Sequence, residues 1–286
     1  MRMKKLKIHD LLKYLFLTIF CITAAALFAC ESVYKKVGEI SSAIPFNYPG
    51  LRIESRFIKP DGLKKYNPVI ICFGDSVTFG WNVTYNFSYP SLLEKDLMNN
   101  HSAVKVINSG IGANTVIKAY SRLKRDILKF EPDYVILNFG LNDGKLQKKN
   151  PGNTRKGEIS YVYNNSFYAP QVQIDNFRNT YIEIIKILKQ KDINLLLLGI
   201  SPVTQDFPPG QDDSFFKMQR ETYAVYNNAV KQIAEQEGID YINLYEVFPI
   251  CKDLKPFIQA DGLHPSAKGL ELISKQVKMY LEDRIQ

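Results

Sequence analysis

The chain has 286 residues, of which 45% are hydrophobic and 12% aromatic, and its formal net charge is +8. This composition is sufficient for one complete core, and no segment repeats at a fixed period, which excludes a solenoid or a propeller. Five of the 37 basic residues and one of the 29 acidic residues lie in the first 30 positions, so the rest of the chain carries only +4. A balance this close to neutral does not indicate a nucleic-acid partner.

Residues 1–30 predict an export signal. Basic residues come first, and the stretch 14–29 then has no charge and ends in small residues. The stretch is shorter than the roughly 20 residues of a bilayer span and suits the apolar region of a signal peptide. The junction Leu27-Phe28-Ala29-Cys30 resembles a bacterial lipobox, which implies lipidation of Cys30 and removal of the signal. We expect an exported protein of the cell envelope, anchored to the membrane by lipid at Cys30. The alternatives are cleavage without lipidation and an uncleaved anchor helix starting at Leu11.

The cysteines indicate neither a disulfide framework nor a zinc site. Only Cys72 and Cys251 lie beyond the leader, and no cysteines have the spacing of zinc ligands. We expect both to be small buried residues, with a single bridge between them as the alternative. No metal or cofactor is predicted.

Residues 31–67 contain prolines and glycines among short apolar pieces, which predicts an irregular tether and an edge segment. From residue 68 to 286 the pattern changes to one domain in which short apolar runs alternate with amphipathic segments. The predicted strands are 69–73, 104–107, 134–139, 193–200 and 239–244. The predicted helices are 89–98, 115–130, 174–189, 215–237 and 266–281. Because parallel strands need right-handed helical crossovers, the pattern predicts a three-layer α/β/α sandwich. The sheet is expected to be five-stranded, parallel and flavodoxin-like, with strand order 2-1-3-4-5.

Two longer connections, 144–173 and 201–214, are expected to leave the carboxyl ends of strands. The first is either a wall of a substrate site or a tolerated surface insertion. Its aromatic residues at 161–168, and Trp81, either contact a sugar ring or an acyl group or pack in the interior.

The first predicted strand runs into Gly74-Asp75-Ser76-Val77-Thr78-Phe79-Gly80. Ligands of open α/β sheets bind beyond the carboxyl ends of the strands, so a serine between glycines at this place is a candidate nucleophile. A turn that caps a helix through Asp75 or Ser76 is the alternative.

A serine nucleophile needs a base, normally a histidine. Of the three histidines, His9 belongs to the leader and His101 precedes the second strand, at the amino end of the sheet. His264 lies in Asp261-Gly262-Leu263-His264-Pro265 before the last helix, where Asp261 can orient its imidazole. His264 is therefore the candidate base.

Attack on an ester also requires donors for the oxyanion. Two polar turns can supply them: Asn108-Ser109-Gly110-Ile111-Gly112-Ala113-Asn114-Thr115 after the second strand and Gly140-Leu141-Asn142-Asp143 after the third. Each is an ordinary strand-to-helix turn when taken alone.

These four ordered blocks resemble the SGNH or GDSL-type hydrolase family over about residues 68–283. The resemblance implies Ser76 as nucleophile, His264 as base and Asp261 as its orienting acid. It also implies an oxyanion hole made by the backbone N–H of Ser76, a backbone N–H of the second block and the Asn142 side chain. The family's oxyanion glycine falls on Ala113, next to Gly112, so either could be the donor. An alanine at this place is expected to keep the donor if its φ is negative.

The resemblance implies a serine esterase that acts through an acyl-enzyme on a carboxylic ester, such as an acetylated glycan or a lipid. An O-acyltransferase acting on an envelope polysaccharide would use the same residues and is the first alternative. A non-catalytic glycan- or lipid-binding envelope protein is the second.

Overall fold

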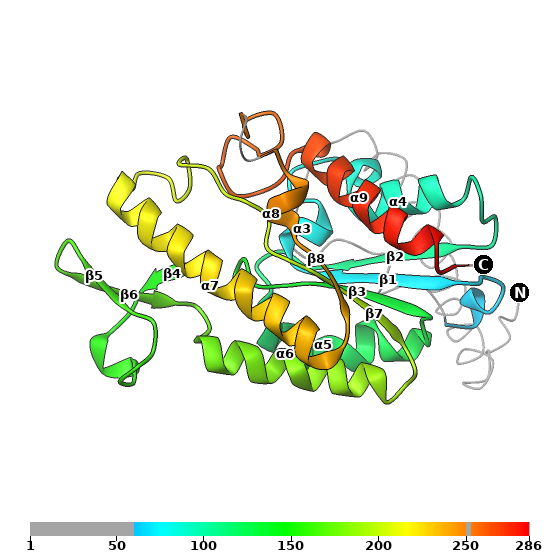
Figure 1. The fold of residues 1–286 in the computed structure, drawn as a ribbon, viewed down its shortest axis with the longest axis horizontal. Helices are drawn as coiled ribbons and strands as arrows, with labels where there is room; N and C mark the ends of the chain where they lie inside the picture. Colours follow the sequence, from blue (N-terminus) through cyan, green and yellow to red (C-terminus); the bar gives the residue numbers. More distant parts are fainter. Residues whose placement is uncertain (1–59, 250–252, 286) are drawn as a thin grey trace, which may run out of the picture. The chain divides into compact units, whose positions relative to one another are not determined.

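The computed structural model describes residues 60–249 and 253–285 (Figure 1). The predicted signal, Cys30, most of the tether and Cys251 lie outside these residues. Within the described part, no helix combines the length and the apolar character that a membrane span requires.

The centre of the fold is a five-stranded parallel sheet with strand order β2-β1-β3-β7-β8. Both the order and the parallel direction were predicted and are confirmed. Strand ends differ from the predicted ones by up to three residues; the strands are β1 (Val69–Gly74), β2 (Lys105–Gly110), β3 (Tyr134–Asn138), β7 (Asn194–Leu198) and β8 (Asp240–Ile242). Gly74 of β1 pairs with Gly110 of β2 and with Asn138 of β3, so these three strands end level with one another.

Helices cover both faces of the sheet, which explains why every residue of β1 is buried. Figure 1 shows α4 (Tyr89–Leu97) and α9 (Ala267–Glu282) together above the sheet, and α5 (Val116–Asp126) and α6 (Ile174–Lys189) below it, with α7 (Asp213–Glu237) packed against α6. The short helices α3 (Ser76–Phe79) and α8 (Leu244–Val247) follow β1 and β8. The predicted three-layer α/β/α sandwich is confirmed.

One predicted helix is divided in two. The segment predicted as a helix over 115–130 consists of α5 and the 3-10 helix η3 (Leu128–Phe130), with Ile127 outside helical geometry between them. Ile127 and Phe130 are both buried, so the apolar periodicity continues through the break and hides it from sequence analysis.

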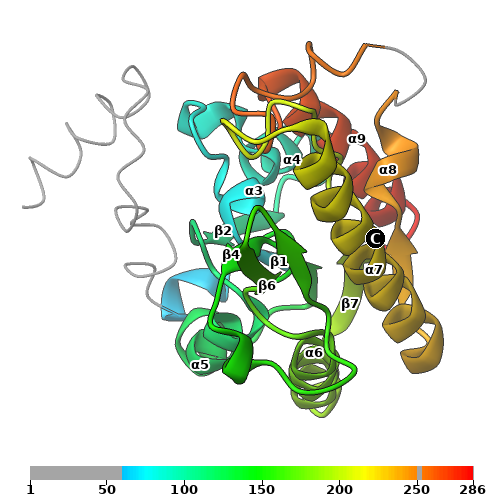
Figure 2. The ribbon, with the colours of Figure 1, turned by 90° about the vertical axis from the view of Figure 1, so that its left-hand side faces the viewer.

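The connection 144–173, predicted as a long loop, contains a second sheet. Its strands are β4 (Leu146–Lys148), β5 (Tyr161–Tyr163) and β6 (Ser166–Pro170), in the antiparallel order β4-β6-β5, with the 3-10 helix η4 (Pro151–Asn153) between the first two. Strands this short show no clear alternation. β4 pairs with β6 across the whole connection, whereas β5 and β6 form a hairpin around Asn164-Asn165. We call residues 145–170 the arm; Figure 2 views it end-on, in front of the main sheet.

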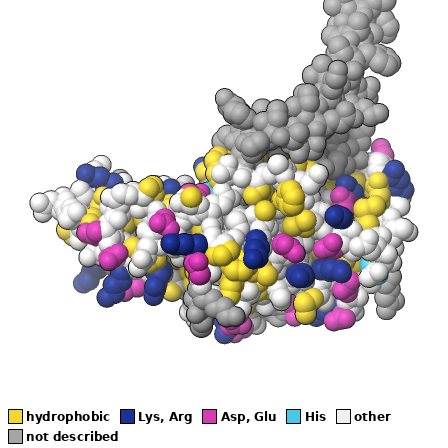
Figure 3. Space-filling model, turned by 90° about the horizontal axis from the view of Figure 1, so that it is seen from above, with side chains coloured by type: hydrophobic (Ala, Val, Ile, Leu, Met, Phe, Trp, Pro, Cys, Tyr) yellow, Lys and Arg dark blue, Asp and Glu magenta, His cyan; other side chains and the backbone are white. Residues whose placement is uncertain are grey.

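The arm is fixed to α7 by aromatic contacts. The rings of Tyr163 and Tyr168 lie edge-on to Phe215, at centroid distances of 5.3 Å and 5.0 Å. Tyr163 and Tyr168 therefore pack against α7. The basic side chains of the arm include exposed Lys148 and Arg155, and Figure 3 shows Lys and Arg side chains on this end of the molecule.

Candidate active site

Ser76 is the first residue of α3, directly after the end of β1. Asp75 caps this short helix, because its Oδ1 accepts the backbone N–H of Val77 at 2.9 Å. Gly74 cannot be replaced without movement, since a Cβ there would lie 2.0 Å from Thr78 Oγ1 and 2.8 Å from the carbonyl oxygen of Asn138. The structure thus places Ser76 directly after the end of a strand and also shows the capping turn that the sequence offered as an alternative.

His264 joins Ser76 and Asp261 into one hydrogen-bonded chain. Its Nε2 lies 2.9 Å from Ser76 Oγ, and its Nδ1 lies 2.6 Å from Asp261 Oδ2. The other oxygen of Asp261 accepts the backbone N–H groups of Leu263 and His264, each at 3.0 Å. Although partial burial raises the pKa of Asp261, these hydrogen bonds and the nearby imidazole lower it to about 2. Asp261 is therefore ionised and oriented toward the imidazole at neutral pH.

The histidine turn is held by the connection 201–214. The backbone N–H of Thr204 donates to the carbonyl of Gly262 at 2.8 Å. Gly262 has a φ of +71°, and a Cβ there would lie 2.6 Å from the backbone nitrogen of Phe207. This close approach requires glycine between Asp261 and His264.

Trp81 forms one side of the site. Its ring lies 5.8 Å from the ring of His264, centroid to centroid, and a Cβ added to Gly112 would lie 3.5 Å from it. Its backbone carbonyl accepts a 2.7 Å hydrogen bond from Gln259 Nε2, which ties it to the histidine loop. Trp81 as a whole is half-buried.

The second block forms a tight turn at the end of β2. The backbone N–H of Asn114 donates to the carbonyl of Ile111 at 3.3 Å, which places Gly112 and Ala113 at the two central positions. Ala113 has a φ of +56°, so the condition of a negative φ, under which alanine was expected to keep the donor, is not met. A positive φ at the second central position is typical of a type II turn, where glycine is preferred. Ala113 therefore adopts a backbone conformation at which glycine is preferred.

Asn142 is held by Asp75, a contact that sequence analysis missed. Asn142 Nδ2 donates to Asp75 Oδ2 at 3.1 Å, across the ends of β3 and β1. Asp75 is only 1% exposed. Burial raises its pKa to about 6, against the opposing effects of the Val77 N–H, His264 and Asn142. One Asp75 oxygen thus orients the serine helix and the other orients the amide.

Asp143 ties the third block to the second. Its Oδ1 accepts the backbone N–H of Val116, the first residue of α5, at 2.9 Å. Asp143 is fully buried, and burial, with the Asp75 charge as a further cause, raises its pKa to about 7. Its position next to Asn142 in the third block was the only sequence signal for it.

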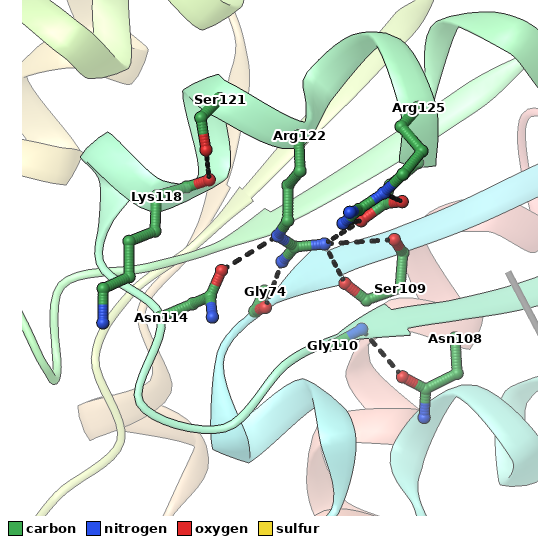
Figure 4. Close-up of polar contacts among 10 residues, drawn as sticks. Gly74, Asn108, Ser109, Gly110, Asn114, Lys118, Ser121, Arg122 and Arg125 are labelled. Atoms are coloured by element: carbon green, nitrogen blue, oxygen red, sulfur yellow. Dashed lines mark hydrogen bonds and ion pairs between the residues drawn. The ribbon is translucent and has the colours of Figure 1, made fainter. Parts of the chain in front are cut away.

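Arg122 of α5 is a residue that sequence analysis missed. Figure 4 shows its guanidinium between the ends of β1 and β2, with hydrogen bonds to Gly74, Ser109 and Asn114. It lies 14 residues beyond Asn108 on an amphipathic helix, where the sequence pattern does not distinguish it from a surface arginine.

The remaining predicted residues lie elsewhere or serve packing. His101 lies in the connection between α4 and β2, at the amino end of the sheet. Cys72 is fully buried in β1 and its thiol is free. In the ranges 60–249 and 253–285, no three His, Cys, Asp or Glu side chains come together in a group that could hold a metal ion.

Three curated relatives are similar to the chain. An arylesterase from Vibrio mimicus is 23% identical over 212 residues, covering 74% of this chain and 87% of the relative. An acetylxylan esterase from Geobacillus stearothermophilus is 27% identical over 174 residues, covering 60% and 69%. An uncharacterized lipoprotein, YqeF of Bacillus subtilis (strain 168), is 22% identical over 211 residues, covering 68% and 73%.

A solved structure shares the fold. The lipase/acylhydrolase from Enterococcus faecalis aligns with a TM-score of 0.59 at 21% identity, covering 77% of this chain and 97% of its own. The model of the GDSL-like lipase/acylhydrolase family matches residues 72–272, which include the serine turn, both polar turns and the histidine turn. The chain therefore belongs to the GDSL-like lipase/acylhydrolase family and is a hydrolase acting on ester bonds.

Proposed function

We propose that the protein is a serine esterase that works through an acyl-enzyme, with Ser76 as nucleophile, His264 as general base and Asp261 as the orienting acid. The observation that carries this proposal is the continuous hydrogen-bonded chain from Ser76 Oγ through the imidazole to Asp261, at 2.9 Å and 2.6 Å. Both distances lie within hydrogen-bond reach, as proton transfer from a serine hydroxyl requires.

In the first step, Ser76 Oγ forms a bond to the carbonyl carbon of the ester while its proton passes to His264 Nε2. The tetrahedral intermediate collapses, the bond to the alcohol oxygen breaks, and the imidazolium returns the proton to that oxygen. Water then attacks the acyl-serine with the same proton transfers, which releases the acid and restores Ser76. The ionised Asp261 stabilises the imidazolium in both halves of the reaction.

We assign the oxyanion hole to the backbone N–H of Ser76, a backbone N–H of the Gly112-Ala113 turn and the side chain of Asn142. Ser76 begins α3, where the N–H groups of the first turn have no partner within the helix. Asn142 Nδ2 uses one hydrogen on Asp75, which leaves its second for the oxyanion. Three donors from three adjacent strand ends would then converge beside Ser76.

The substrate class proposed is a short-chain ester on a carbohydrate. The half-buried ring of Trp81 beside His264 supports a sugar or small acyl group at this side of the site. The acetylxylan esterase among the relatives supports the same class. An acyltransferase reaction needs an acceptor hydroxyl in place of water, and comparing products with and without an acceptor polysaccharide separates the two reactions.

We also propose that the protein is exported and anchored in the cell envelope by lipid on Cys30. The leader pattern supports this, as does the lipoprotein among the relatives. Metabolic labelling with a fatty acid is expected to mark the wild type and not Cys30→Ser; equal labelling of both would contradict the anchor.

The central test is hydrolysis of p-nitrophenyl acetate and of acetyl-xylan by purified protein. Ser76→Ala and His264→Asn are expected to lose activity by at least about 10³-fold, and Ser76→Ala is expected to lose fluorophosphonate labelling. Ser121→Ala, on the exposed surface of α5, and His101→Asn serve as matched controls and should keep wild-type rates. Wild-type activity in Ser76→Ala would exclude the proposed mechanism.

A further inference from the structure

Arg122 occupies a buried position directly behind the turns that carry Ser76 and the oxyanion donors. Its side chain is 5% exposed, although it is permanently charged. Burying such a charge is costly unless it is paired and hydrogen-bonded, so its contacts show what holds it there.

The guanidinium binds backbone carbonyl groups at the ends of two neighbouring strands. Its Nη2 donates to the carbonyl of Gly74 at 2.9 Å, two residues before Ser76. Its Nη1 donates to the carbonyl of Ser109 at 2.9 Å, near the end of β2. The carbonyl of Gly74 also accepts the backbone N–H of Ile111 at 3.1 Å, so the two strand ends are joined at one point.

The same side chain holds the far end of the oxyanion turn. Arg122 Nε donates to Asn114 Oδ1 at 2.9 Å, and Asn114 closes the turn that contains Gly112 and Ala113. One planar group thus contacts Ser109 just before that turn, Asn114 at the end of the turn, and Gly74 at the end of β1 (Figure 4).

The positive charge of Arg122 is balanced by a carboxylate further along α5. Arg122 Nη1 lies 2.9 Å from Asp126 Oδ2, one helical turn further along α5, and the guanidinium lies 4.3 Å from the ring centre of Phe73. Arg125 pairs with the same carboxylate at 2.6 Å, but its side chain is 52% exposed and its hydrogen bonds within the described residues go to Asp126. Arg125 therefore reproduces the ion pair of Arg122 without its contacts to the two turns.

We infer that Arg122 is a positioning residue that sets the distance between Ser76 and the oxyanion donors of the second block. This inference rests on the proposed esterase function. A lysine could keep the charge, but a single ammonium cannot make the forked contacts of a planar guanidinium to acceptors in different directions. Because a misplacement of about 1 Å can cost about 100-fold in rate, loss of these contacts acts on kcat.

The test uses the variants Arg122→Ala, Arg122→Lys and Arg125→Ala, with activity counted per active site titrated by a fluorophosphonate. We expect Arg122→Ala to lower kcat by about 100-fold and Arg122→Lys by about 10-fold or more, with KM within about threefold of wild type. Arg125→Ala should keep kcat within about twofold. Added guanidinium chloride at millimolar concentration, below denaturing levels, should restore kcat of Arg122→Ala at least about fivefold and saturably, with no such gain for Arg122→Lys.

A kcat per titrated site that is unchanged in folded Arg122→Ala, or reduced equally in Arg125→Ala, would overturn the inference. Hydrogen exchange provides a readout independent of turnover: amides of residues 74–77 and 108–115 should exchange faster in Arg122→Ala and Arg122→Lys than in Arg125→Ala. Equal exchange in all three variants would also overturn it. Failure of the esterase proposal would give a different result: Ser76→Ala would hydrolyse the ester at the wild-type rate.

Discussion

Asp75→Asn is the substitution that most directly tests how the site is assembled. The wild-type carboxylate accepts the N–H of Val77 with one oxygen and Nδ2 of Asn142 with the other. An asparagine has one oxygen and one NH2 group, so if its oxygen keeps the Val77 contact, its NH2 faces the NH2 of Asn142. Two donors repel each other, and Asn142 is expected to turn away from its present position.

The kinetic consequence follows from the loss of one oxyanion donor. Removing such a donor typically costs about 10²- to 10³-fold in kcat, or about 2.7–4 kcal/mol of transition-state stabilisation. We expect this loss in kcat with little change in KM, because the donor acts on charge that develops only in the transition state.

The pH dependence of stability gives a second, independent signal. Burial raises the pKa of Asp75 from its ordinary value of 3.8 to about 6. A raised folded-state pKa means that the protonated form favours folding, so this contribution is fully present below about 3.8 and is lost as pH rises through about 6. The carboxamide of the Asp75→Asn variant cannot titrate. The stability of the wild type relative to the variant should therefore fall by about 2 kcal/mol between pH 4.5 and pH 8.

Both effects can be measured on the same preparations. Steady-state hydrolysis of p-nitrophenyl acetate gives kcat and KM, and urea unfolding at pH 4.5 and pH 8 gives the two stability differences. Asp61→Asn is the matched control, because the Asp61 side chain is 90% exposed. A kcat of Asp75→Asn within about threefold of wild type would refute the role assigned to Asp75. A stability difference between wild type and Asp75→Asn that does not change with pH would refute the raised pKa of the Asp75 carboxyl.

Three other residues of the site have measurable roles. Asp261→Asn should lower kcat by about 10²- to 10⁴-fold in steady-state assays, because the asparagine does not hold the imidazole in the required tautomer; a loss below tenfold would contradict its role. Ala113→Gly should keep kcat within about threefold. Ala113→Val should lower the midpoint of thermal unfolding by several degrees in calorimetry, because a β-branched residue is strained at a φ of +56°. Equal midpoints for the wild type and Ala113→Val would count against a strained turn. Trp81 is the single tryptophan of the chain and lies beside His264. Phosphonylation of Ser76 should therefore change the tryptophan fluorescence emission. The same reagent should leave the emission of Ser76→Ala unchanged.

Much of the fold was predictable because its signals are local. Each apolar run of the main sheet is bounded by polar turns and followed by a segment with helical periodicity, and both patterns depend on neighbouring residues. The second sheet was not predicted, because its strands are too short to show an alternating pattern and β4 pairs with β6 across the whole connection. The break at Ile127 was hidden for a related reason: a buried residue keeps the apolar pattern whether the backbone is α-helical or not.

The sequence by itself determined the positions of the strands of the main sheet, the place of Ser76 at the end of the first strand and the pairing of Asp261 with His264 in one turn. Each of these follows from residue types close together in the chain, since parallel strand ends meet at one edge of a sheet and a turn joins residues three apart. Only the tertiary structure decided how the site is held. Asn142 meets Asp75 across 67 residues, and Arg122 meets Gly74 across 48. The backbone of Ala113 likewise adopts a positive φ only within its folded turn. Hydrogen bonds of this kind depend on distances of a few tenths of an ångström between packed elements, which no local pattern of residues encodes.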